Sequence, residues 1–135
     1  MTTTPISPTV AEAIHEIQET FAESTVTVTV TGDGDGGAWV VIDAVSLGST
    51  YLQDSSWIAF LITFAYPDAD VYPHFVRSDL KRMDGAALGA GFSPTTWGPA
   101  GDPGMQLSRR SNRLNPAVDT AATKVLKVLK WLNEQ

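Results

Sequence analysis

The most distinctive polar segment of this sequence lies near its C-terminal end. It contains three arginines, two serines and an asparagine, which are Ser108, Arg109, Arg110, Ser111, Asn112 and Arg113. An arginine side chain presents a fork of N–H donors that matches a carboxylate or a phosphate, and the N-terminus of the helix expected just after this segment also favours anions. We interpret the segment as a partner-binding surface, in which charge reversal at Arg110 should weaken binding more than tenfold. The alternative is internal pairing with Asp102, Asp119 or the acidic first helix.

Trp97 and His74 are predicted to join the arginines at the same end of the molecule. Trp97 lies in a stretch rich in glycine and proline, where it is either an exposed recognition residue or a plug over a small core. His74 follows Pro73 at the start of an expected strand. The predicted partner-binding set is therefore Arg109, Arg110, Arg113, Asn112, Ser108, Trp97 and His74.

The catalytic potential of the chain is limited. It has no cysteine, which excludes a thiol nucleophile and disulfides. A small hydrolase or transferase that uses His74 with Ser108 or Asp79 stays open as an alternative. However, no nucleophile elbow and no metal-binding histidine pair accompanies His15 or His74, which favours structural or surface histidines. We assign no catalytic residue, no metal and no cofactor.

Residues 32–37, Gly-Asp-Gly-Asp-Gly-Gly, carry two carboxylates in a short turn. Asp33 and Asp35 are oxygen donors of the kind that calcium prefers, but a calcium loop needs six or more oxygens and usually a later bidentate glutamate. Glycine and aspartate also tolerate the positive φ angles of hairpin turns. We therefore predict a hairpin connection here.

The first element that must position these residues is a helix over residues 8–23. Val10, Ile14, Ile17 and Phe21 form one apolar stripe, and the opposite face is acidic. Pro8 suits the first helical turn, and Thr9 with Glu12 has the spacing of a capping box.

Four strands are expected after this helix, over residues 25–31, 38–45, 57–66 and 73–80. Their short connections predict a four-stranded antiparallel meander packed on the helix. Residues 84–115 show little periodicity and are expected to be irregular. The pair Asn115–Pro116 is typical of a helix start. The closing helix should bury Val118, Ala122, Val125, Leu126, Leu129 and Leu132 and expose Lys124, Lys127 and Lys130.

Length and composition indicate a single α+β domain over residues 1–135, with 1–7 as a flexible tail. Residues 1–76 carry ten acidic side chains and no lysine or arginine, whereas the remainder holds all nine basic side chains and five acidic ones. A sequence pI near 4.6 disfavours general nucleic-acid binding. The longest apolar run, residues 57–66, is half of a membrane span, and the N-terminus lacks the features of a secretion signal. A cytoplasmic protein without membrane contacts is the default expectation.

Two Tyr-Pro pairs link the third and fourth expected strands. The third strand ends in Tyr66-Pro67, and Tyr72-Pro73 opens the fourth. This arrangement resembles the ubiquitin-conjugating (E2) superfamily, in which an apolar third strand runs into a Tyr-Pro turn and a proline-led fourth strand. The resemblance covers residues 8 to 132 and implies the UBC-like order of helix, four-stranded meander, long segment and closing helix.

The sequence departs from active E2 proteins at the catalytic segment. These proteins carry a cysteine after the fourth strand, usually past a His-Pro-Asn motif, and this chain has neither. A thioester to a ubiquitin-like protein cannot form on it. The resemblance therefore implies a non-catalytic, bacterial E2-like binding module in a ubiquitin-like modification or defence pathway. Its partner would be a ubiquitin-like protein or an E1-like adenylating protein. A plain structural domain that oligomerises through an apolar edge strand is a further alternative.

Overall fold

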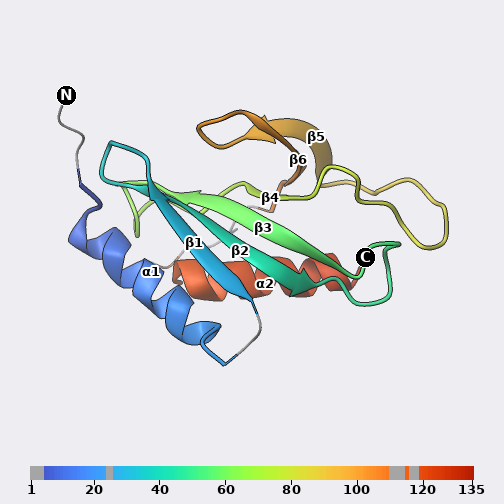
Figure 1. Ribbon diagram of the computed structural model, residues 1–135, viewed down its shortest axis with the longest axis horizontal. Helices are drawn as coiled ribbons and strands as arrows, with labels where there is room; N and C mark the ends of the chain where they lie inside the picture. Colours follow the sequence, from blue (N-terminus) through green and yellow to red (C-terminus); the bar gives the residue numbers. More distant parts are fainter. Residues whose placement is uncertain (1–4, 24–25, 110–114, 116–118) are drawn as a thin grey trace.

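The computed structural model describes residues 5–23, 26–109, 115 and 119–135, and these form an α+β fold (Figure 1). An N-terminal helix is followed by a six-stranded antiparallel sheet and a C-terminal helix. In chain order the elements are α1 (Pro8–Thr20), β1 (Thr27–Gly32), β2 (Ala38–Ser46), β3 (Ser55–Ile62), β4 (His74–Val76), β5 (Phe92–Trp97), β6 (Asp102–Leu107) and α2 (Ala121–Asn133).

The strands lie in the order β1-β2-β3-β4-β6-β5, so β1 and β5 form the two edges of the sheet. Both helices lie on one side of the sheet (Figure 1). We call this side the helix face and the opposite side the open face. Alternation along β2 directs Ala38, Val40 and Ile42 into the core on the helix face, and Trp39 points to the open face.

The four predicted strands lie side by side in chain order as β1 to β4, but the sheet is larger than predicted, because the segment expected to be irregular contains two more strands. β5 and β6 pair as a hairpin, and β6 also pairs with β4. Their connection contains Gly98 and Gly101, both with positive φ. Proline and glycine within β5 and β6 hide the period-two pattern, which explains why the sequence did not reveal them.

The first helix begins as expected at Pro8 but ends at Thr20, three residues earlier than predicted. Its cap is Ser7, whose side-chain oxygen accepts a hydrogen bond from the Val10 amide, and not the Thr9–Glu12 pair. The Ser7 amide in turn donates to the Gly36 carbonyl at 2.9 Å, which fixes the helix start beside the β1–β2 turn.

The closing helix begins later than predicted. Thr120 has extended backbone angles and caps α2, because its side-chain oxygen accepts a hydrogen bond from the Thr123 amide. The Thr123 side-chain oxygen in turn accepts a hydrogen bond from the Thr120 amide. Asn115 therefore lies upstream of the helix, and Pro116 and Val118 lie outside the described residues. Two positions on α2 differ from the prediction, because Lys124 is buried and Leu126 is exposed.

The glycine-rich connection between β1 and β2 is a hairpin turn, as predicted. One carboxylate oxygen of Asp33 accepts hydrogen bonds from the amides of Asp35 and Gly37, at 2.8 and 2.9 Å. Gly37 is required there, because a Cβ would lie 2.4 Å from the Ile62 carbonyl oxygen. Within the described ranges, no helix is long and apolar enough to cross a lipid bilayer.

Candidate functional site

The open face of the sheet carries a cluster of aromatic rings contributed by four strands. Trp97 lies at its centre, with ring centroids 4.9 Å from Trp57, 5.8 Å from Trp39 and 6.2 Å from Phe75. The three tryptophans are partly exposed, and Phe75 is buried. Tryptophan combines a large apolar area with few rotatable bonds, and it is enriched at the energetically dominant positions of protein interfaces.

Trp97 reaches this cluster from the edge of the sheet by crossing over β6 at Gly104. A Cβ at Gly104 would lie 2.7 Å from Cδ1 of Trp97, so the ring occupies the space that any other residue would need. The indole nitrogen is buried without a hydrogen-bond partner. Trp97 is therefore packed among the other rings of the cluster while part of its surface stays exposed.

A groove of about 570 Å³ lies beside the cluster, with Trp57 as its aromatic wall. Its remaining walls are polar apart from Pro103, and they come from β2, β3, the segment that follows β4, and β6. They consist of Asp43, Ser55, Ser56, Arg77, Ser78, Asp79 and Pro103. The volume falls within the range of ~300–1,000 Å³ typical of ligand pockets.

A β-bulge aims Asp43 at this groove. Ile42 pairs with Ile58 and Val45 with Ser56, so Asp43 and Ala44 together oppose Trp57. Ala44 has a φ of 65°, the one positive value among described residues other than glycine. The Asp43 carboxylate accepts a hydrogen bond from the Ala44 amide at 2.7 Å and so stabilises this uncommon conformation.

Arg77 and Asp79 form a rigid polar wall on the other side of the groove. The guanidinium donates to both carboxylate oxygens of Asp79, at 2.6 and 2.9 Å, and also to the Ser55 carbonyl. The hydrogen bond from Arg77 lowers the pKa of the Asp79 carboxyl and keeps it ionised. Asp79 is consequently held as a partner of Arg77.

A second polar group lies on the helix face and is buried. His74 has no exposed surface, and neither of its ring nitrogens has a hydrogen-bond partner. Its ring packs against Phe60 with centroids 5.0 Å apart. Burial, reinforced by the positive charge of Lys124 and opposed by Asp70, lowers the pKa of His74 to about 3. His74 is therefore a neutral member of the core.

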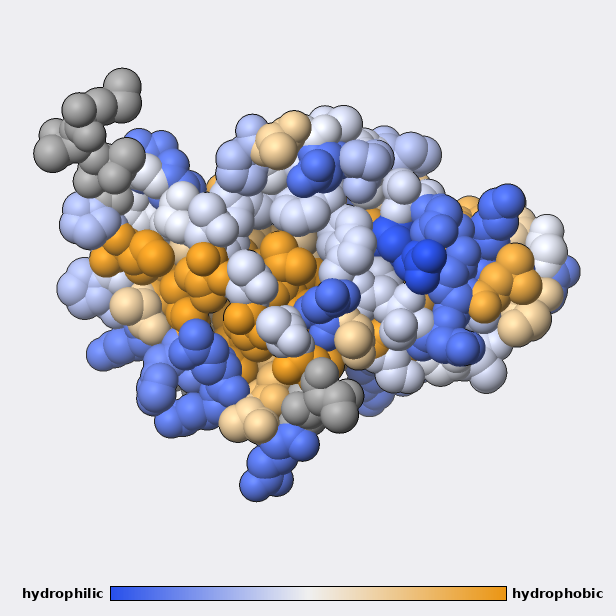
Figure 2. Space-filling model, in the orientation of Figure 1, coloured by the Kyte–Doolittle hydropathy of each residue, from blue (hydrophilic) through white to orange (hydrophobic). Residues whose placement is uncertain are grey.

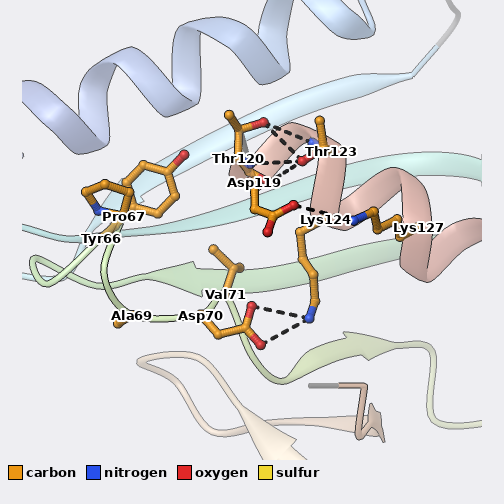
Figure 3. Close-up of a pocket in the computed structure, with 10 residues that line it drawn as sticks. All are labelled: Tyr66, Pro67, Ala69, Asp70, Val71, Asp119, Thr120, Thr123, Lys124 and Lys127. Atoms are coloured by element: carbon orange, nitrogen blue, oxygen red, sulfur yellow. Dashed lines mark hydrogen bonds and ion pairs between the residues drawn. The ribbon is translucent and has the colours of Figure 1, made fainter. Parts of the chain in front are cut away.

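Lys124 was predicted to be exposed on the closing helix, but it is buried. Its ammonium group reaches from α2 to the two carboxylate oxygens of Asp70, at 3.1 and 3.3 Å (Figure 3). The side chains of Lys124 and Asp70 are 9% and 21% exposed. They line a small cleft between residues 66–71 and the start of α2, and the cleft encloses about 10 Å³, the space of one water molecule.

The first Tyr-Pro pair, Tyr66–Pro67, lines this cleft. The peptide bonds Tyr66–Pro67 and Tyr72–Pro73 are both cis. The Tyr66 hydroxyl accepts a hydrogen bond from the Ala121 amide at 3.1 Å, which ties the segment to the first turn of α2. Burial raises the pKa of this hydroxyl. The contacts around the cleft thus hold the connection between β3 and β4 against α2, and the cleft has no room for an organic ligand.

The predicted partner-binding residues that the structure describes do not form one surface. His74 faces the helices, and Trp97 lies on the open face. The guanidinium of Arg109 stacks 4.9 Å from the Trp131 ring on α2. Ser108 accepts a hydrogen bond from the Gln106 side chain at 3.2 Å. Arg110, Asn112 and Arg113 lie outside the described residues.

The same geometry separates the groups of the alternative hydrolase site. The imidazole of His74 bonds to neither Ser108 nor Asp79, since both of its nitrogens lack partners. Ser108 is bonded to Gln106, whose side chain points to the opposite face of the sheet from His74, and Asp79 is engaged by Arg77. Among the described residues, no group of three or more side chains is placed to hold a metal ion.

Two residues of the aromatic cluster, Trp39 and Trp57, were not among the predicted partner-binding residues. The pattern of each strand could have revealed them, because each tryptophan stands at an outward-facing position between two inward-facing residues. In comparisons with known proteins, no family model, no curated protein and no solved structure matches this chain.

Proposed function

We propose that this protein is a non-catalytic binding module of E2-like architecture that holds a protein partner on the open face of its sheet. In the pathway that the Tyr-Pro resemblance suggests, the partner is a ubiquitin-like protein or an E1-like adenylating protein. The observation that carries the proposal is the partly exposed tryptophan cluster beside a groove of about 570 Å³.

The physical support is the rigidity of this surface. The aromatic rings pack on one another, and Asp43 and Arg77 are fixed by bonds to neighbouring groups. A partner side chain that fills the groove would contact the Trp57 ring without ordering a loop, so little entropy would be lost at the contact. The arginine segment is proposed to add polar contacts to acidic groups of the partner, with Arg109 held in place by its stacking on Trp131.

Binding of purified ubiquitin-like and adenylating proteins tests the proposal, with affinities measured by isothermal titration calorimetry. Replacing a central aromatic anchor costs ~2 kcal/mol or more, so Trp57→Ala should weaken binding at least about 30-fold. Asp43→Arg, which leaves the aromatic cluster intact, should weaken it as well. Leu126→Ala is the matched control, because Leu126 is 45% exposed on α2 and lies on the other side of the sheet.

The outcomes separate the parts of the proposal. Binding that is lost in Trp57→Ala and Asp43→Arg but retained in Leu126→Ala supports the groove. Unchanged affinity in both groove variants would remove the groove from the interface. The double variant Arg109→Glu/Arg110→Glu tests the arginine segment separately, with a loss of more than tenfold expected. Absence of binding to either class of protein would overturn the proposed function.

A further inference from the structure

The two edges of the sheet differ in how they are protected from pairing with other strands. The β5 edge contains Pro94, which has no N–H group to offer to a neighbouring strand. The β1 edge, Thr27–Gly32, contains no proline and no charged residue, and its pairing with β2 has no bulge. Natural proteins commonly block an open edge by one of these devices. The β1 edge is therefore available for pairing.

The surroundings of β1 are apolar. Val28 and Val30 are only partly buried where they pack on the core, as are Ile6, which lies against Gly32 at the end of β1, and Phe21. Figure 2 shows hydrophobic residues gathered over this part of the molecule, around β1 and its border with α1. In the described part of the chain, β2 is the one strand that pairs with β1. A partner that extends the sheet would cover both the free backbone groups and this apolar border.

The sequence of β1 is self-complementary. Residues 27–31 read Thr-Val-Thr-Val-Thr in either direction, with Thr29 at the centre. In an antiparallel pair of two copies related by a two-fold axis at Thr29, Val28 opposes Val30 on the helix face. On the open face Thr27 opposes Thr31. Valine–valine contacts and threonine–threonine hydrogen bonds are both favourable cross-strand pairs.

The absence of charged side chains on β1 is also compatible with pairing to a second copy. A two-fold axis places two identical strands side by side, so a strand that carried charges of one sign would repel its copy. Residues 1–76 contain ten acidic side chains and no basic one, yet β1 contains none of them. On α1 the carboxylate of Glu16 points to α2, where it accepts a hydrogen bond from Thr120. The β1 edge is thus a neutral strip in a strongly acidic half of the chain.

We propose that two copies of this protein associate through their β1 strands, antiparallel and centred on Thr29, to form one continuous sheet. The inference does not depend on the proposed function, because the groove at Trp57 is formed by other strands. Both open faces would lie on the same side of the joined sheet, and both pairs of helices on the other.

A cysteine crosslink tests this register directly, because the chain has no cysteine of its own. Residues that face each other in an antiparallel pair have Cα atoms ~4.5–5.5 Å apart, which a disulfide can span. Thr29→Cys should therefore form a disulfide dimer on mild oxidation. Thr27→Cys is the matched control, since the two copies of residue 27 would be more than about 13 Å apart, offset along the strands by four residue steps of ~3.3 Å each.

Mass measurement by analytical ultracentrifugation tests the association without oxidation. The wild-type protein should approach 29 kDa, twice the 14.5 kDa of one chain, as concentration rises. Thr29→Lys places like charges on the axis and should remain at the mass of one chain. The equivalent change on the other edge, Thr96→Lys, should dimerise like the wild type. A wild-type mass that stays at 14.5 kDa at every concentration, or equal crosslinking of the two cysteine variants, would overturn the proposal.

Discussion

Replacing His74 by leucine is expected to change how the stability of this protein depends on pH. The imidazole has no exposed surface and no hydrogen-bond partner for either nitrogen. It packs between the strand partners Phe60 and Leu107, next to the charges of Lys124 and Asp70. Leucine has a similar volume and no polar atoms, so it fits the site without the cost of two unsatisfied nitrogens.

The magnitude follows from the two pKa values of the histidine. In the unfolded chain the pKa is about 6.5, and in the folded protein burial lowers it to about 3. Between these values the unfolded chain binds a proton that the folded protein does not bind, so the free energy of unfolding falls as the pH falls. At pH 4.5, two units below the unfolded pKa, the loss amounts to about 3 kcal/mol.

Urea denaturation at a series of pH values measures this effect. Between pH 7.5 and 4.5 the wild type should lose about 3 kcal/mol more than His74→Leu, because the contribution of the carboxylates is common to both proteins. Leu126→Ala is the control, since it removes an exposed side chain that carries no titratable group and should leave the wild-type profile in place. If wild type and His74→Leu had parallel pH profiles, the reasoning about His74 would be refuted.

Two further predictions concern groups on opposite faces of the sheet. Asp70→Asn should destabilise the protein toward the lower end of ~3–5 kcal/mol, because it removes the carboxylate that pairs with the buried ammonium of Lys124, whereas Lys124→Met should cost less. Thermal unfolding of both variants checks this order, and a larger loss in Lys124→Met would contradict it. Gly104→Ala should cost about 1–3 kcal/mol, because the added methyl group displaces the Trp97 ring. Near-ultraviolet circular dichroism should show the loss of the packed tryptophan signal, and Gly89→Ala, where a Cβ meets no neighbour, is the matched control.

The α+β class, the first helix and the first strands could be predicted from the sequence because each follows a local pattern. The stripe of Val10, Ile14 and Ile17 and the alternation of β2 reflect burial on one face, and the structure confirms both. The turn at Asp33 was equally local, since its hydrogen bonds reach only two and four residues along the chain.

The β5–β6 hairpin and the position of Lys124 could not be predicted, because both depend on contacts between distant segments. Glycine is typical of loops, so Gly104 did not indicate a strand; the structure shows that Trp97 occupies the space that a side chain there would need. Lys124 reads as a solvent-facing lysine because its partner, Asp70, is 54 residues away in the chain. Likewise, the arginine segment was prominent in the sequence, but the groove at Trp57 is assembled from four segments, none of which is distinctive alone.

The uneven placement of the four tryptophans has a consequence for spectroscopy. Trp39, Trp57 and Trp97 share the open face, and only Trp131 belongs to the helix layer. Intrinsic fluorescence will therefore report mainly on whether the β5–β6 hairpin stays paired with the rest of the sheet. Far-ultraviolet circular dichroism will report on the helices. The two signals should superimpose during denaturation only if the hairpin and the helix layer unfold in one cooperative step.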